Sequence, residues 1–262
     1  MTTETVPRAE TAIEEGLGFV GAVRDKIDLI VTPTFFVILA AAVGAVWAYA
    51  DIDSTTGRIL SWDNMWPNIT DHLLMTFWST VLVVAIAIPL GIFITRPRFK
   101  GFAGPILTFA NSGQAIPAFG LLVIFAGAIG RGQQTAIIAF TVFALLPVLR
   151  NTMVGLQQVD QSVIEAGRGM GLSKRQALFD IELPLAVPVI LAGVRTALVI
   201  NVGMATLAFL IGGGGLGERI YAGLQLNRPT AVFIAGGMVA ALALLIDFLA
   251  ALAERFLKPK GI

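Results

Sequence analysis

The sequence predicts an all-α membrane protein, a polytopic helical bundle of about six transmembrane helices. Hydrophobic residues make up 56% of its 262 residues, charged residues only 13%, and the mean hydropathy is +0.83. A soluble domain carries about a quarter charged residues, so this chain has more apolar surface than one core can hide, and much of it should face lipid. The long apolar runs also exclude a membrane β-barrel, whose strands alternate over only ~10 residues.

Six apolar stretches account for the predicted helices. Crossing a bilayer takes roughly 20 mostly apolar residues, and backbone polar groups in lipid must be satisfied within the segment, which favours helices. The predicted spans are residues 33–50, 70–95, 103–129, 134–156, 186–211 and 230–254. Between the first two spans, Trp62 and Trp66 lie in a predicted external loop, where we expect them to anchor at the headgroups; ligand contact is the alternative.

The positions of Lys and Arg predict that both termini are cytoplasmic. With this orientation thirteen of the 18 basic residues face the cytoplasm, four face outward, and Arg195 lies inside a span, as the positive-inside rule expects. Residues 1–32 then form a cytoplasmic N-terminal segment, residues 33–256 the transmembrane domain, and residues 257–262 a cytoplasmic tail. Residues 12–31 have the apolar spacing of a helix on the membrane surface, or else form a frayed lead into the first span.

Composition excludes several kinds of site. The chain has no Cys, which excludes disulfides and thiolate metal sites, and its single histidine, His72, excludes a multi-histidine metal site. A net charge of +1 gives no reason to expect nucleic-acid binding. The first 25 residues lack a basic start followed by an apolar core, so we expect no cleaved signal peptide.

The longest predicted cytoplasmic loop, residues 157–185, has the end signals of two short helices. Asp160 can cap the first helix, and Gly171 lies where a residue of left-handed conformation would end it. Ser173 and Gln176 have the spacing of a capping box for the second helix. Two capped amphipathic helices would form a rigid protrusion at the membrane surface.

Within this loop the stretches "EAGRGMG" and "IELP" are separated by nine residues. In both motif and spacing the loop resembles the EAA loop of ABC importer permeases. The matching positions are Glu165, Ala166, Gly167, Gly171, Ile181, Leu183 and Pro184, with Gly167 where the family more often has Ala. The resemblance implies a coupling helix that seats in a groove of a cytoplasmic ATPase. We also expect Pro184 to end the second short helix before the fifth span.

Three further stretches are distinctive: "GQAIPAFGLLVIF" at 113–125, "ALLPVLRNTMVGLQQVD" at 144–160 and "IGGGGLGERIYAGL" at 211–224. In these stretches the chain resembles the permeases of glycine betaine, carnitine and choline importers. Ala115 stands where the family more often has Thr, which leaves the solute open. The resemblance implies a type I importer in the bacterial inner membrane. Its partners would be two ATPase subunits, a second permease chain, identical or homologous, and an extracytoplasmic substrate-binding protein.

The chain itself has no ATP-binding motif, so we expect no catalytic site and no cofactor in it. The resemblance implies that ATP and Mg are bound by the partner ATPase subunits. The glycines of residues 212–215 lack the Lys-Ser/Thr of a P-loop, and a tight break that turns the fifth span into an external gate helix is the favoured interpretation.

Polar residues inside the spans are candidates for a translocation pathway, because lipid disfavours them. They are Asn111, Ser112, Gln114, Asn201 and Thr206, and we add Pro117, which has no N–H to donate and should kink its helix. The alternative for each side chain is a hydrogen bond that holds two helices together. Arg195 and Asp247, the two deepest charges, are expected to be neighbours that offset each other's desolvation; Asp247 as a proton relay is the alternative.

A path lined by neutral polar groups suits a zwitterion or a quaternary ammonium compound. Such cations are bound by aromatic cages, and the spans hold no dense aromatic cluster, so we expect a separate protein to supply high-affinity recognition. The sequence therefore predicts the permease of an ATP-driven importer for a compatible solute. The alternatives are an importer of an amino acid, sulfonate or metal chelate, and a channel or membrane enzyme without an ATPase.

Overall fold

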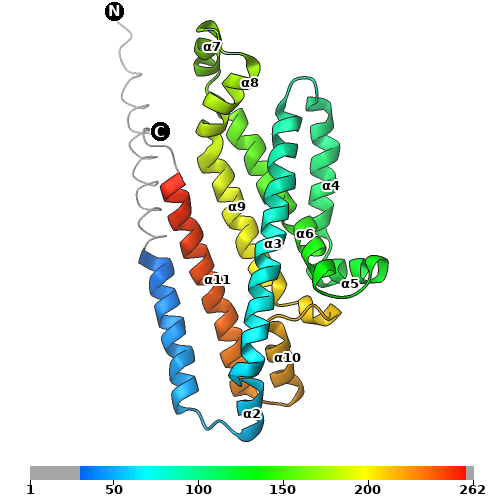
Figure 1. Cartoon of the computed structure of the whole chain (residues 1–262), viewed down its shortest axis with the longest axis vertical. Helices are drawn as coiled ribbons and strands as arrows, with labels where there is room; N and C mark the ends of the chain where they lie inside the picture. The colour runs from blue at the N-terminus through cyan, green and yellow to red at the C-terminus, as the bar shows by residue number, and fades with distance from the viewer. Residues whose placement is uncertain (1–29, 258–262) are drawn as a thin grey trace, which may run out of the picture.

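The computed structural model describes residues 30–257, and within this range every regular element is a helix (Figure 1). The first helix is Ile30–Tyr49. The elements after it are α2 (Ser54–Ile59), α3 (Trp62–Thr95), the 3₁₀ turn η1 (Lys100–Phe102), α4 (Ala103–Ala115), α5 (Ala118–Ile129), α6 (Gln133–Gln157), α7 (Gln161–Gly169), α8 (Lys174–Ala177), the π-helical η2 (Leu178–Glu182), α9 (Leu183–Ala205), the 3₁₀ turn η3 (Ala208–Ile211), α10 (Gly217–Gln225) and α11 (Pro229–Leu257).

The centre of the bundle is formed by α3, α6 and α9, which pack against one another, and α11 packs against α9. Val83, Phe140, Val148 and Ala197 are fully buried in this core. Val43 of the first helix packs into a further cluster with residues of α3 and α11. Figure 1 shows α7 and α8 projecting from one end of the bundle, while α2 lies at the opposite end.

Five described helices are long and apolar enough to cross a membrane, and they match five of the predicted spans. The second is longer than predicted, because α3 begins at Trp62. Trp62 and Trp66 therefore lie on its first turns and not in a loop; both are exposed, with ring centroids 5.5 Å apart. Their position at a helix end agrees with anchoring at the membrane interface.

The predicted third span, residues 103–129, is not one straight helix. It consists of α4, extended at its start by η1, and α5, and the chain bends by 102° between them. Ile116 has extended backbone (ψ 131°) because the ring of Pro117 disfavours helical geometry in the residue before it. The 13 residues of α4 rise ~20 Å, less than the ~30 Å of a hydrocarbon core. The pair is thus a broken span or a re-entrant segment, and the predicted kink at Pro117 is confirmed.

The fifth span also differs from its prediction at both ends. The second helix of the loop at residues 157–185 does not stop at Pro184, because residues 174–205 form one helical run. It passes Pro184 through the π turn η2, in which the backbone N–H of Leu183 donates to the carbonyl of Leu178, five residues back. The wider turn accommodates a residue that has no N–H of its own.

At its other end the fifth span finishes at Ala205, six residues earlier than predicted. The 3₁₀ turn η3 follows, and Gly212 has left-handed backbone (φ 73°) before α10 begins. The predicted break at the glycine run is therefore confirmed. The predicted surface helix at 12–31 and the tail lie almost wholly outside the described residues.

Candidate functional site

The first helix of the protrusion, α7, is capped at both ends as predicted. The Asp160 carboxylate accepts a hydrogen bond from the backbone N–H of Ser162 at 2.8 Å, and this bond lowers the pKa of Asp160. At the other end Gly171 has φ 100°. Its N–H donates to the carbonyl of Arg168, and the N–H of Leu172 donates to the carbonyl of Gly167. These two bonds form a Schellman motif, which fixes the direction in which the chain leaves the helix.

The second helix begins at the predicted capping box. The side chain of Ser173 accepts from the N–H of Gln176, and the Gln176 side chain accepts from the N–H of Ser173. α7 packs against α8 and η2. Gly167 is buried in this contact, and a methyl group on it would meet the side chains of Ile181 and Leu172. Gly167 and Ile181, two positions of the sequence motif, are therefore packing partners.

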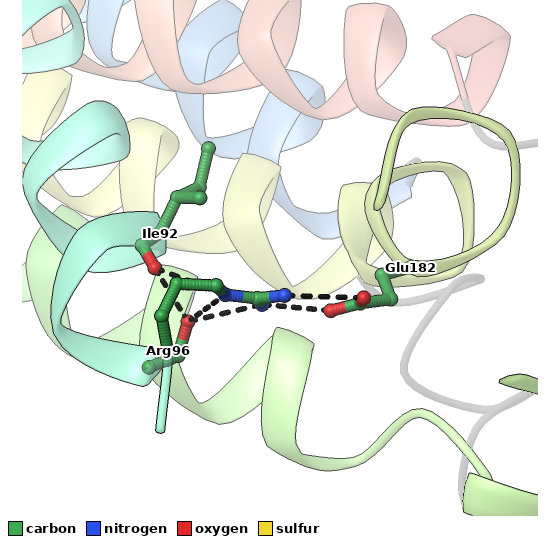
Figure 2. A network of polar contacts seen from close by, with 4 residues as sticks. Ile92, Arg96 and Glu182 are labelled. Atoms are coloured by element: carbon green, nitrogen blue, oxygen red, sulfur yellow. Dashed lines mark hydrogen bonds and ion pairs between the residues drawn. The ribbon is translucent and has the colours of Figure 1, made fainter. Parts of the chain in front are cut away.

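An ion pair fastens the protrusion to the transmembrane bundle (Figure 2). Arg96, the residue that follows α3, donates from both terminal guanidinium nitrogens to the Glu182 carboxylate, at 3.1 and 2.7 Å. Its Nε also donates to the Ile92 carbonyl at 3.3 Å. A bidentate pair of this kind fixes orientation as well as distance. Spacing along the sequence does not reveal this pair, although Glu182 lies inside the "IELP" stretch.

Several charged and apolar side chains are exposed on the outer surface of the protrusion in the isolated chain. Glu165 and Ala166 are exposed on α7. Three apolar side chains, Val163, Met170 and Phe179, are also exposed, Met170 by 81%. Because this region projects from the bundle, these exposed apolar side chains are candidates for contact with another protein.

The six candidate pathway residues lie in two settings. Asn111 and Ser112 are exposed on α4, Gln114 is half-buried, and Pro117 is exposed in the link to α5. Asn201 and Thr206 belong to the region of α9, where Asn201 is fully buried and Thr206 half-buried. α4 packs against α6, whereas α9 packs against α3, α6 and α11. A pathway role for these residues stays a prediction.

Asn201 holds two helices together. Its side-chain N–H donates to the hydroxyl of Thr80 on α3 at 3.0 Å, and both residues are buried. This contact favours the alternative interpretation, the interhelical hydrogen bond, for this residue. Thr80 was missed, because a lone Thr in an apolar run gives no sign of its partner.

The two deepest charges are neighbours, as predicted. The guanidinium of Arg195 on α9 donates to the carboxylate of Asp247 on α11 through Nε at 2.6 Å and a terminal nitrogen at 2.7 Å. Both side chains are about four-fifths buried, with 20% and 22% exposed. The pair joins α9 to α11 and offsets the cost of placing either charge inside the bundle.

The fold and the capped protrusion define the class: a membrane-embedded permease subunit. The family described as the binding-protein-dependent transport system inner membrane component matches residues 87–259, and the chain belongs to it. The glycine betaine/carnitine/choline permease OpuCB of Bacillus subtilis is 40% identical over 194 residues, 73% of this chain and 88% of the relative. The osmoprotectant import permease OsmY of Salmonella typhimurium is 42% identical over 188 residues, 72% and 80% of the two chains.

Solved structures show the same architecture. The MetNI methionine ABC transporter in an inward-facing conformation has a chain 26% identical, with a TM-score of 0.65; the match covers 74% of this chain and 96% of that one. An amino acid ABC transporter, at 16% identity and a TM-score of 0.61, shares the fold over 72% of this chain and 92% of its own. The chain is therefore a permease of the type I ABC importer fold.

Proposed function

We propose that this permease forms the path for a quaternary ammonium compatible solute, such as glycine betaine, choline or carnitine. The observation that carries the proposal is the set of relatives at 40–42% identity over more than seven-tenths of the chain, which are permeases of glycine betaine, carnitine and choline transport systems. The similarity to the methionine transporter is more distant, at 26% identity. It makes methionine the competing solute to test.

We further propose that α7 and α8 are cytoplasmic and dock on an ATPase subunit. The excess of Lys and Arg on the side of the predicted spans that carries α7 and α8 supports the orientation. The exposed Val163, Met170 and Phe179 supply apolar area for an interface, and Glu165 a charge beside it. Both termini would then lie in the cytoplasm of a bacterial inner-membrane complex.

In this mechanism the chain does no chemistry of its own. Two partner ATPase subunits bind ATP and Mg and close on each other, and each draws one coupling helix with it, which requires a second permease chain. The caps of α7 and the Arg96–Glu182 pair would transmit this movement to α3 and α9 without bending. An extracytoplasmic binding protein would deliver the solute to the opposite end.

The test is uptake by the complete complex in proteoliposomes. Radiolabelled glycine betaine should accumulate only with ATP inside and binding protein outside, and unlabelled methionine should not compete. Uptake of methionine with no uptake of betaine, choline or carnitine would overturn the solute assignment.

The coupling role is tested in the same vesicles. Glu165→Ala and Gly171→Asp should leave ATP turnover in place but lower uptake per ATP. Asp63→Asn, which removes an exposed carboxylate near the start of α3 at the other end of the molecule, is the matched control. Wild-type ratios in both loop variants would contradict the docking assignment.

A further inference from the structure

We propose that the end of the bundle opposite α7 and α8 holds a pocket for a trimethylammonium group. The inference rests on the function proposed above and adds a site at which the permease itself contacts its solute. It follows from one cavity, the charges in it and the aromatic rings beside them.

The cavity has a volume of about 570 Å³ and is assembled from distant parts of the chain. α3 contributes Asp71, α6 contributes Gln133, and the segment from η3 to α10 contributes Phe209, Glu218 and Tyr221. Glycines 212–214 form part of its wall. Binding pockets for small molecules have volumes of about 300–1,000 Å³, so the space is sufficient for a solute of this size.

The charge in this cavity is negative. The Asp71 carboxylate accepts one hydrogen bond, from the Gln133 side-chain amide at 3.3 Å. Within residues 30–257 it has no ion-pair partner. Glu218, in contrast, forms an ion pair with Arg219 at 3.0 Å and accepts from the Asn68 amide at 2.9 Å. Asp71 is thus the uncompensated charge, and it favours a cationic ligand.

Two aromatic rings line the same cavity. Phe209 and Tyr221 lie with ring centroids 5.0 Å apart and planes inclined at 32°. Quaternary ammonium groups have no N–H to donate, so proteins bind them through aromatic faces and nearby negative charge. Two rings and two carboxylates that line one pocket are therefore suited to this chemistry.

A metal ion fits the cavity less well. Calcium requires 6–8 oxygen ligands, and in the described part of the chain no group of three or more His, Cys, Asp or Glu side chains could hold a metal. The two rings would add no ligand. The pocket chemistry thus favours an organic cation over an inorganic one.

The glycines at 212–214 allow the backbone to lie directly beside the Asp71 carboxylate. Gly212 and Gly214 have left-handed backbone, with φ of 73° and 78°. A methyl group on Gly214 would lie 2.5 Å from Oδ2 of Asp71. A larger residue would therefore displace the carboxylate from its present place, and the absence of a side chain here keeps the pocket shape.

The test is direct binding to the assembled complex in nanodiscs. Saturation-transfer NMR would compare tetramethylammonium with tert-butanol, a neutral molecule of similar shape. We expect tetramethylammonium to give the larger signal, and its affinity to fall about five- to tenfold in Asp71→Asn and in Phe209→Leu. Tyr221→Leu is the replacement if either variant fails to assemble, and Asp63→Asn is the control for loss of one carboxylate elsewhere on α3.

Each result supports or refutes the proposed trimethylammonium pocket. Equal signals from the two probes, or undiminished binding in Asp71→Asn, would overturn the pocket. Betaine uptake measured on the same preparations separates this result from the solute assignment. Uptake without binding at the pocket would refute this inference alone, whereas tetramethylammonium binding without betaine, choline or carnitine uptake would refute the proposed function and leave a cation site.

Discussion

The two ends of this molecule are built in opposite ways. The α7–α8 end is held by helix caps, a Schellman motif and the bidentate Arg96–Glu182 pair. Neighbouring side chains occupy the space beside the Cα atom of Gly167. The η3–α10 end turns through left-handed glycines and encloses an open cavity. In the roles proposed above, the α7–α8 end transmits force and should be rigid, whereas the η3–α10 end meets the solute and should leave room for it. The contrast predicts different sensitivities to substitution.

The largest effect is expected at the η3–α10 end. A methyl group on Gly217 would overlap the backbone carbonyl oxygen of Thr206, which cannot rotate away as a side chain could. Gly217→Ala should therefore destabilise the protein by about 3 kcal/mol, the upper range for overpacking. The measurement is the thermal midpoint of the purified complex.

Gly236→Ala in α11 is the matched control, because a methyl group there meets nothing within 4 Å. It should be neutral or slightly stabilising, since Ala is the better helix former. Equal midpoints for the two variants would show that the joint between α9 and α10 is looser than the structure indicates.

The next effect concerns the attachment of the protrusion. Arg96→Gln and Glu182→Gln each remove one charge of the pair and leave the other without its partner. A double-mutant cycle should give a coupling energy of about 1–2 kcal/mol, which is below the value for a fully buried pair because 30% of the Arg96 side chain is exposed. The same variants should lower uptake per ATP. Additive effects would mean that the pair does not hold the protrusion to α3.

The two ends also differ in what the sequence can reveal. Asp160, Gly171, Ser173 and Gln176 act on residues at most five positions away, so their spacing alone predicts the caps, and all of them are confirmed. The Arg195–Asp247 pair was predictable for a different reason. Only two charged residues lie deep in the predicted spans, and an unpaired charge in the hydrocarbon region is costly, so the two are expected to pair with each other.

The pocket gave no such signal. Asp71 and Gln133 are 62 positions apart, and Glu218 lies 150 positions from its partner Asn68. Spacing cannot show such contacts, because they depend on how the helices are packed. One sign was available, since Asp71 lies just inside a predicted span, where a carboxylate is costly. The bend at Pro117 was predicted, but its angle of 102° depends on packing against α6.

A smaller effect tests the end of α7. A methyl group on Gly171 would meet no atom within 4 Å, so the cost of Gly171→Ala comes from its left-handed backbone alone, about 1 kcal/mol. Gly169→Ala, two residues earlier in regular helix and equally unobstructed, should not destabilise the loop. Hydrogen exchange of the α7 amides measures the difference. Equal protection in both variants would contradict the Schellman motif as the element that stiffens the loop.

The smallest effect is the pH dependence of the α7 cap. The hydrogen bond from Ser162 lowers the pKa of Asp160 below its ordinary value of 3.8. A carboxylate with a lowered pKa stabilises the folded state fully above the unfolded pKa and loses this contribution as the pH falls through the folded pKa. Protection of the first α7 turn should therefore be flat from pH 8 to about 5 and decline only in more acidic solution. Asp160→Asn, which keeps a side-chain acceptor but cannot titrate, should remove the decline. A decline near neutral pH in the wild type would assign the titration to another group and leave the cap without an electrostatic role.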